Sequence, residues 1–434
     1  MTFRQQQITL IPITVILIIL TACKKESADL APEITLHSPT KHQIFNVLDT
    51  IWVSGELNDD KRLTAIKVVL TDPGFNPVHK AFYFYPSGHQ FSIDFGYPLD
   101  NINLKGGKHY LQIRADDGVN FRNFYQEILL TEVPQELHRI IVLTSPQTGT
   151  IQVTAIDNSD QIDLLANIQG DYAGSEISSA HRQLYIAGKT HLNLLAFDLS
   201  NLNIAWQLTA YPPFPLHREN CLYFDQSLFV SFYHQFLLGY NASGSVVFNA
   251  SVEETDSPAR IVRSGNYLIT DIQKQNSELP HIMTLFHQTG AEKQRVQTNF
   301  QVVEFHSTNS NTVVITANNH DNGLILTYDV EQNLLYTEHL ISDQINCSVK
   351  TDENNILIGT DEAILHYIYD LNQFIVLNTN EGSKRMAYDI LNSRIFSVWE
   401  NSIIVYQYPQ MQYQKTFPFS DTILNLHLQY AWKE

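Results

Sequence analysis

The sequence predicts an all-β protein, an immunoglobulin-like β-sandwich followed by a seven-bladed β-propeller. Two observations support this fold class. Val, Ile, Thr, Tyr and Phe suit half-buried pleated surfaces and are plentiful, and no stretch beyond the N-terminus has sustained helical periodicity. In the last two-thirds of the chain, an aromatic residue followed by a polar one recurs at steps of 37 to 46 residues. A period of roughly 40–45 residues built from short strands is typical of propellers, with one four-stranded blade per repeat.

Residues 1–22 have the features of a secretory signal peptide. Arg4 precedes an apolar run over residues 8–20, and 13 residues are too few to cross a bilayer comfortably as a helix. The run ends in Leu20-Thr21-Ala22-Cys23, which resembles a bacterial lipobox. That resemblance implies that Cys23 is acylated and becomes the first residue of the mature protein. The alternative is an ordinary secretory signal with a chance cysteine.

The residues after Cys23 indicate where the anchored protein resides. Lys24 and Lys25 follow at once and no Asp adjoins the cysteine, which by the same resemblance permits sorting to the outer membrane. Residues 23–33 are expected to form a polar tether, and ten residues of flexible coil reach about 17 Å. We therefore expect the first domain to lie close to the membrane.

Residues 34–134 are predicted to form the sandwich. Apolar and polar residues alternate in seven short stretches, separated by Asp-Pro-Gly, Pro-Ser-Gly and Gly-Gly turn signals. The predicted strands are Ile34–His37, Thr50–Gly55, Thr64–Leu70, Ala81–Tyr85, Phe91–Phe95, His109–Ala115 and Phe124–Leu130. The stretch from Ser54 to Asp60, with Leu63 and Ile66-Lys67-Val68 after it, resembles immunoglobulin-like modules of Bacteroidota surface lipoproteins. The segment holds no cysteine pair, so an intersheet disulfide is excluded.

Two acidic pairs in this segment could bind a metal ion. Asp59-Asp60 and Asp116-Asp117 are expected in loops at the same end of the sandwich. Four carboxylates on adjacent loops could hold Ca²⁺, which takes 6–8 oxygen ligands. The alternative is that both pairs open tight turns, as Asp116-Asp117-Gly118 suggests.

Residues 138–434 are predicted to form the propeller. In each repeat the aromatic residue is expected at the end of the third strand, packed between blades, and the polar residue at the start of the turn to the fourth strand, where Asp and Asn bond backbone N–H groups. Six copies have this pattern: Phe197-Asp198, Tyr240-Asn241, Phe286-His287, Tyr328-Asp329, Tyr369-Asp370 and Tyr406-Gln407. A looser copy, Ile156-Asp157, precedes them.

The two ends of the propeller segment are expected to share one blade. Residues 138–168 contain only three predicted strands, and residues 422–430 supply one more at the C-terminus. Joining them gives a composite blade that leaves no exposed sheet edge at the closure. Six continuous blades and one composite blade give the count of seven.

One repeat carries a more specific resemblance. The sequence from Leu194-Leu195-Ala196-Phe197-Asp198 to Trp206 resembles the quinoprotein-type, YVTN-like propeller repeat, and residues 238–244 are a weaker match. The resemblance implies the fold. No cofactor cage is recognisable, so the family's redox chemistry is not carried over and no cofactor is expected beyond the calcium discussed above.

The candidate ligand-binding residues lie in loops expected on one face of the propeller. Aromatic rings, imidazoles and cations on one rim suit a polar, flat ligand such as a glycan or an extended peptide. The alternative is ordinary polar loop decoration, and a metal site built from His191, His234 and His320 would need three blades to converge. The candidates are Tyr172, His191, Tyr211, His217, Arg218, His234, Arg260, His320, Lys384 and Arg385.

The remaining cysteines and the overall charge exclude some functions. Cys221 and Cys347 are expected in different blades, too far apart to bond, and to be two buried free thiols. The formal net charge is −18, and it becomes −19 when removal of residues 1–22 takes away Arg4. Because an acidic surface repels phosphate backbones, we expect no nucleic-acid partner.

Together these patterns favour a non-catalytic, lipid-anchored binding or scaffold protein of the cell envelope. It would be a monomer held to the outer membrane through Cys23, with a propeller face presented to a glycan or an envelope protein. The alternative is a propeller enzyme, a polysaccharide lyase or hydrolase or a quinone-dependent dehydrogenase, acting on the axial face. An enzyme would need a deep axial pocket with converging carboxylates or histidines.

Overall fold

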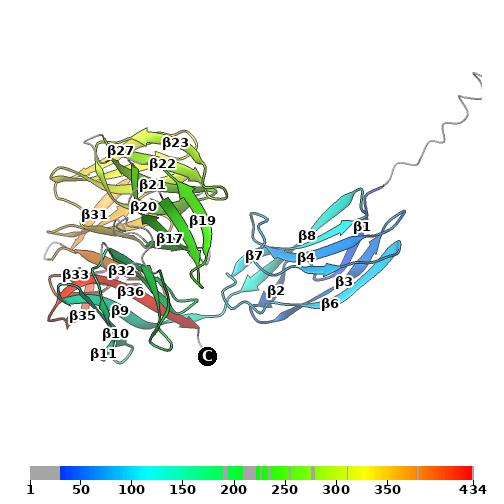
Figure 1. The fold of residues 1–434 in the computed structure, drawn as a ribbon, viewed down its shortest axis with the longest axis horizontal. Helices are drawn as coiled ribbons and strands as arrows, with labels where there is room; N and C mark the ends of the chain where they lie inside the picture. The colour runs from blue at the N-terminus through cyan, green and yellow to red at the C-terminus, as the bar shows by residue number, and fades with distance from the viewer. Residues whose placement is uncertain are drawn as a thin grey trace, which may run out of the picture. The chain divides into compact units, whose positions relative to one another are not determined.

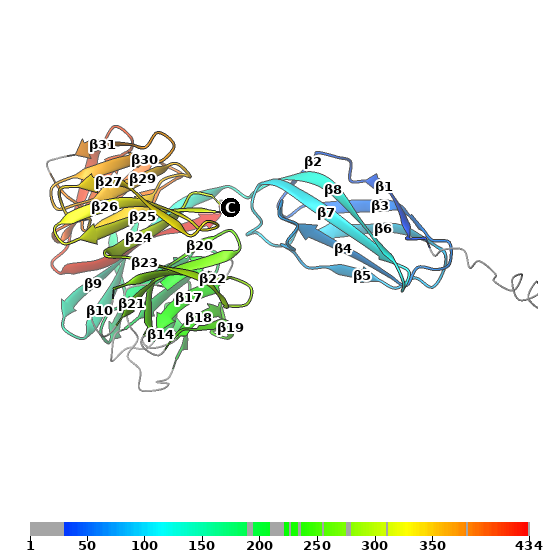
Figure 2. The same cartoon turned by 90° about the horizontal axis from the view of Figure 1, so that it is seen from above.

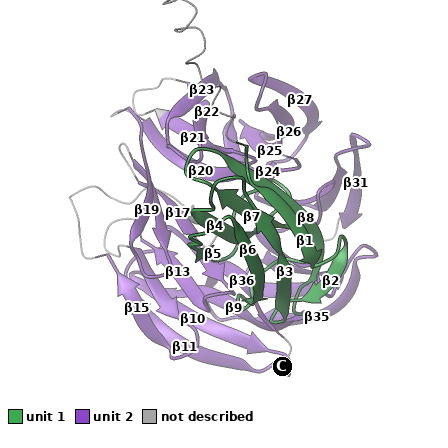
Figure 3. Cartoon of the chain, turned by 90° about the vertical axis from the view of Figure 1, so that its right-hand side faces the viewer, with its two compact units in different colours: residues 1–134 green, residues 135–434 purple. Residues whose placement is uncertain are grey.

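The computed structural model consists of two compact units, Met1–Pro134 and Gln135–Glu434 (Figures 1, 2 and 3). Every helix or strand element among the described residues is a β-strand, so the protein is all-β there. The structure describes residues 30–188, 194–208, 221–224, 227–232, 236–253, 256–274, 279–309, 311–378 and 381–432. The predicted signal peptide and Cys23 lie outside these ranges.

The first unit contains two sheets. The three-stranded sheet has the order β1 (Glu33–Ser38), β3 (Thr50–Asn58), β6 (Gln90–Pro98). The five-stranded sheet has the order β2 (Gln43–Asn46), β8 (Phe121–Thr131), β7 (Gly107–Asp116), β4 (Ala65–Thr71), β5 (Phe82–Phe84).

Both sheets of the first unit contribute to a single apolar core. Alternate residues of β3, including Ile51 and Val53, are fully buried, and so are Val68 of β4 and Ile113 of β7. Burying each such side chain contributes about 1.5–3 kcal/mol. Alternation with period two therefore determines which face of each strand meets the core.

One strand of this unit was not predicted. The segment Gln43-Ile44-Phe45-Asn46 forms β2, which pairs in parallel with β8 at the edge of the five-stranded sheet. The sequence gives little signal here, because the strand is short, polar at both ends and leaves Ile44 65% exposed. The described part of this unit therefore has eight strands, so the prediction of seven was wrong.

The second unit contains seven four-stranded antiparallel sheets among its described residues. The first sheet has the order β11 (Ile162–Gln169), β10 (Thr150–Asp157), β9 (Gln135–Gln147), β36 (Thr422–Trp432). In the other six, strands follow chain order: β12 (Gly174–Ser178), β13 (Gln183–Ala187), β14 (Leu194–Asp198), β15 (Asn203–Gln207); β16 (Cys221–Phe224), β17 (Ser227–Phe232), β18 (Phe236–Asn241), β19 (Val246–Ser251); β20 (Asp256–Ser264), β21 (Tyr267–Lys274), β22 (His281–Phe286), β23 (Glu292–Gln297); β24 (Gln301–Ser307), β25 (Thr312–Asn319), β26 (Asn322–Asp329), β27 (Leu334–Ile341); β28 (Cys347–Lys350), β29 (Asn355–Gly359), β30 (Ile364–Ile368), β31 (Gln373–Asn378); β32 (Arg385–Asp389), β33 (Arg394–Trp399), β34 (Ser402–Gln407), β35 (Gln412–Pro418).

The sheets of the second unit follow one another in a propeller-like ring (Figure 3). The first strands of successive sheets, β12, β16, β20, β24, β28 and β32, contact one another in that order. Strand β36 contacts both β32 and β12, which returns the series to its start. It pairs with β9 from Thr422↔Ser145 to Trp432↔Gln135, so the C-terminal strand joins the first sheet as the sequence led us to expect.

The recurring aromatic-polar pairs lie where third strands end. Asp198 Oδ1 accepts hydrogen bonds from two backbone N–H groups of the following turn, and Asp329 Oδ1 does the same. Tyr328 and Phe197 are buried in the cores that these sheets share with their neighbours. Phe286 is 41% exposed, so the predicted packing between blades is wrong there.

Candidate binding cavity

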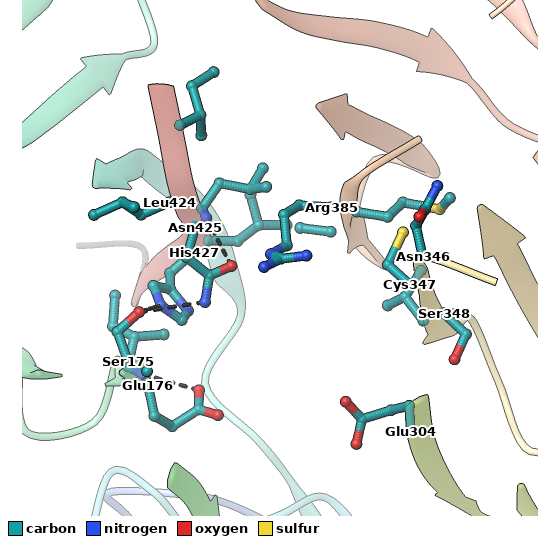
Figure 4. A pocket seen from close by; sticks show the side chains of 18 of the residues that line it. Ser175, Glu176, Glu304, Asn346, Cys347, Ser348, Arg385, Leu424, Asn425 and His427 are labelled. Atoms are coloured by element: carbon teal, nitrogen blue, oxygen red, sulfur yellow. Dashed lines mark hydrogen bonds between the residues drawn. The ribbon is translucent and has the colours of Figure 1, made fainter. Parts of the chain in front are cut away.

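The first strands of the second unit surround a cavity of about 790 Å³ (Figure 4). Residues of β12, β20, β24, β28, β32 and β36 line it. These strands form the inner ring, so their cavity-facing side chains converge although they are far apart in the sequence. The cavity is the place in this unit where polar groups from most of the sheets meet.

Two carboxylates line this cavity. Glu176 lies on β12 and Glu304 on β24, and in Figure 4 their carboxylates point toward each other. Each uses one oxygen locally: Glu176 Oε1 accepts the N–H of Ile177 at 2.9 Å, and Glu304 Oε1 accepts that of Phe305 at 3.2 Å. The same local contact therefore leaves one oxygen of each carboxylate available to a ligand.

Enclosure changes the acidity of both carboxyl groups. Both side chains keep some exposure because they line a cavity, but protein surrounds them. This desolvation raises the pKa of Glu176 to about 7, and the negative charge of Glu304 adds to the effect. Desolvation also raises the pKa of Glu304, although the positive charge of Arg260 opposes it. Near neutral pH, Glu176 therefore exchanges between its charged and neutral forms.

A hydrogen-bonded network of neutral groups borders the same cavity. Ser175 Oγ lies 2.7 Å from His427 Nε2 and 2.8 Å from Tyr172 Oη, and it accepts a hydrogen bond of 3.3 Å from Asn425 Nδ2. Burial lowers the pKa of His427 to about 4, so its imidazole is neutral at physiological pH. The network presents hydroxyl, amide and imidazole groups without adding charge.

The Ser–His contact recurs elsewhere in the ring. His306 Nε2 of β24 lies 2.7 Å from Ser348 Oγ of β28, and burial lowers the pKa of His306 to about 3. In both cases a histidine on one strand of the inner ring, β36 or β24, bonds a serine on the next strand of that ring, β12 or β28. We interpret these pairs as links between adjacent sheets, because a pair that repeats around the ring has no special catalytic position.

Three of the ten predicted ligand-binding residues line the cavity: Tyr172, Arg260 and Arg385. Arg260 was expected in a loop but lies within β20, where its backbone N–H donates a hydrogen bond to Asp271 Oδ1. Lys384 precedes β32 and pairs with Asp361 rather than lining the cavity.

His320 occupies the exposed turn between β25 and β26 and does not line the cavity. The other five candidates, His191, Tyr211, His217, Arg218 and His234, lie outside the described residues.

Cys347 is a free thiol that lines the cavity. It is half-buried, whereas the prediction was full burial. Its sulfur lies 3.6 Å from the carbonyl oxygen of Ser383, and burial raises the pKa of the thiol to about 11. The thiol is therefore protonated and weakly nucleophilic at neutral pH. The side chain of Cys221 lies outside the described part of the chain.

The acidic pairs of the first unit lie in turns. Asp59 Oδ1 accepts hydrogen bonds from the backbone N–H groups of two residues that follow it, and Asp117 Oδ1 does the same. Asp116 Oδ1 accepts the backbone N–H of Gly118, and its Oδ2 forms an ion pair with Arg114. Asp60 is exposed. Within the described ranges, no three His, Cys, Asp or Glu side chains are grouped to hold a metal ion. Calcium binding by these four residues stays a prediction.

Sequence reasoning missed Glu176, Glu304, Ser175 and His427. The available signal is a charged residue interrupting an apolar strand, as Glu304 does after Val302-Val303. That pattern does not distinguish a cavity-lining acid from a solvent-facing one. Only the ring decides which alternate residues of a first strand face the centre.

Comparisons with known proteins leave the family of this chain open. No protein-family model matches the chain, and no curated protein matches it. Similar solved structures include the computationally designed Ika8 protein, with a TM-score of 0.47 and 11% identity over 68% of this chain and 92% of that chain. A chain of the mitotic checkpoint complex has a TM-score of 0.46 and 9% identity over 59% of this chain and 82% of that one. The dihydro-heme d1 dehydrogenase NirN in complex with DHE has a TM-score of 0.47 and 14% identity, over 67% of this chain and 75% of that chain.

Similarity at this level carries no argument about function. Among the described residues, no helix is long and apolar enough to span a membrane.

Proposed function

We propose that this chain is a lipid-anchored protein of the bacterial cell envelope that binds a hydroxyl-rich ligand, such as a glycan, in the central cavity of a seven-bladed β-propeller. In this proposal the first unit is an immunoglobulin-like spacer and acylated Cys23 is the outer-membrane anchor. The resemblance of Leu20-Thr21-Ala22-Cys23 to a lipobox supports the anchor. The seven four-stranded sheets and their ring of first strands support the propeller.

The convergence of uncharged and charged polar groups in one cavity is the observation that carries the proposal. Tyr172, Ser175 and Asn425 present a hydroxyl and amide surface, and Glu176 and Glu304 present carboxylate oxygens. Sugar hydroxyl groups both donate and accept, so they can satisfy all of these groups at once. A cavity also suits a glycan unit or chain end better than an extended peptide, which fits an open rim.

A glycan array with the full-length mature protein tests this function. We expect binding to a defined set of glycans that the variant S175A/N425A loses by at least tenfold, because it removes the network without changing charge. The melting temperature of the variant must be measured alongside, so that unfolding is separated from loss of binding. A pull-down that captures an envelope protein equally well with wild type and variant would instead favour a scaffold role.

The two carboxylates favour a second candidate, a glycan-cleaving enzyme. Many glycoside hydrolases use one carboxylic acid and one carboxylate on either side of the scissile bond. Glu176, with its pKa raised to about 7, has the acidity of a general acid, and Glu304 lines the same cavity. Release of reducing ends from an array-positive glycan, abolished in both E176Q and E304Q, would establish the enzyme. Binding without cleavage would exclude it for that glycan.

A further inference from the structure

We infer that the central cavity selects a glycan unit that carries a protonated amino group, with Glu176 and Glu304 holding the ammonium and the Tyr172–Ser175–Asn425 network holding its hydroxyl groups. This inference rests on the proposed binding function and names the class of ligand. An amino sugar is the simplest chemical group that combines one cation with several hydroxyls on a rigid ring.

The two carboxylates reach the cavity from two different sheets. They extend from β12 and β24 toward the same part of the cavity (Figure 4). Their contacts with Ile177 and Phe305 fix one oxygen of each and leave the other for a ligand. A compact ammonium group has three donors, so one can bond a carboxylate while the others remain for the second acid or for sugar and protein oxygens.

The two acids differ in the charges that surround them. The positive charge of Arg260 on β20 favours the ionised form of Glu304. The negative charge of Glu304 in turn disfavours the ionised form of Glu176. Among the described residues no ion pair involves Glu176, so its carboxylate is enclosed without a cation in contact. Arg385 lies apart from both acids in Figure 4 and donates to the carbonyl of Lys384. Enclosing a carboxylate without a counter-ion is unfavourable, and a ligand ammonium would relieve that penalty.

The neutral network adds hydroxyl and amide groups to the same cavity. His427 is uncharged at neutral pH because burial lowers its pKa to about 4. Ser175, which it bonds, directly precedes Glu176 on β12, so the hydroxyl network and the acid are neighbours in the wall. A simple alkyl diamine would satisfy the acids and leave this network unused. An amino sugar satisfies both.

Three matched tetrasaccharides test the inference by calorimetry at neutral pH: a β-1,4-glucosamine tetramer, its fully N-acetylated form and cellotetraose. They differ only in the group at the second carbon. We expect the amine form to bind wild type at least tenfold more tightly than the other two. E176Q should remove that preference, so that the three tetrasaccharides bind the variant with similar affinity. E353Q, a substitution in the exposed turn between β28 and β29, should behave as wild type.

The outcomes separate this inference from the function on which it rests. Equal binding of all three tetrasaccharides, or a preference for the amine that survives in E176Q, would overturn the amine inference while leaving glycan binding in place. If none of the tetrasaccharides binds but the array is positive for neutral glycans only, the inference also fails. No binding in either assay would reject the proposed function itself. E176Q must keep the wild-type melting profile at acid pH, where Glu176 is already neutral.

Discussion

The indole N–H of Trp206 donates a hydrogen bond of 2.9 Å to the carbonyl oxygen of Ala242 and so joins two neighbouring sheets. Trp206 lies on the outer strand β15, whereas Ala242 lies in the turn between β18 and β19 of the next sheet. The ring also lies against Gly244, whose φ is +80°, and near Tyr185 and Tyr240 at centroid distances of 6.0 Å. A turn of one sheet is thus shaped to receive the aromatic ring of another.

Substituting Gly244 by alanine should destabilise the protein by about 2–4 kcal/mol. Its φ is unfavourable for a side chain, and a Cβ would lie 2.8 Å from the Trp206 ring. Gly149 is a matched control, because its φ is +83° but no atom lies within 4 Å of its Cβ position. G149A should cost only about 1 kcal/mol. Urea denaturation of both variants measures the difference, and equal losses would show that the Trp206 contact contributes nothing.

Truncation after Ser420 should prevent stable folding of the second unit. It removes β36, whose buried Ile423, Leu426 and Leu428 complete the core shared with the last sheet, and it exposes the pairing edge of β9. We expect a large drop in melting temperature and rapid proteolysis of the second unit. Deleting residues 433–434 alone is the control. A truncated protein that melts like the full-length chain would contradict closure of the ring by β36.

The stability of E176Q should depend on pH differently from that of wild type. The pKa of Glu176 is raised from 4.5 to about 7 on folding, so between these values the folded state holds a proton that the unfolded state has released. Wild-type stability therefore falls as pH rises through this window, and the penalty is complete above it. Glutamine carries no charge to desolvate. E176Q should be more stable by on the order of 2–3 kcal/mol at about pH 8 and equal at about pH 4.

Denaturant titrations at a series of pH values measure this effect. E353Q, an exposed substitution, should follow the wild-type curve throughout. Parallel curves for E176Q and wild type would show that Glu176 is not desolvated by the cavity.

The two histidine links should produce the opposite dependence. Burial lowers the pKa of His427 to about 4 and that of His306 to about 3, from 6.5. As pH falls below 6.5 the unfolded state binds protons that the folded state does not, so these groups reduce stability progressively down to their folded pKa values. H306Q keeps a hydrogen-bonding group near Ser348 without this titration. The stability of H306Q should therefore fall less steeply than that of the wild type as pH falls below 6.5. H37Q, which replaces an exposed histidine of β1, is the control.

Replacing Cys23 by serine should release the protein from membranes. The lipobox resemblance implies acyl chains on this cysteine, and each buried CH₂ contributes about 0.8 kcal/mol to anchoring. Expressed in a Gram-negative host, the wild type should partition into the detergent phase and C23S into the aqueous phase. C347S, which alters a thiol lining the cavity, should partition as wild type. Aqueous partitioning of the wild type would favour the ordinary secretory signal.

Much of the repeat could be predicted because its signals are local. Asp198 and Asp329 bond backbone groups two and three residues on, so a short stretch of sequence contains the whole interaction. The alternation in β3 is local in the same way. Strand β2 was missed because its own residues carry little strand signal. Its pairing with β8 is what makes it a strand.

The sequence by itself determined the strand-rich character, the spacing of the sheets and the turn residues that end their third strands. Only the tertiary structure decided that Glu176 and Glu304, 128 residues apart, share one cavity with the Ser175–His427 contact. The physical reason is that turns and alternation depend on near neighbours along the chain. A cavity in a ring depends on which side of each first strand faces the centre, and the packing of whole sheets fixes that choice.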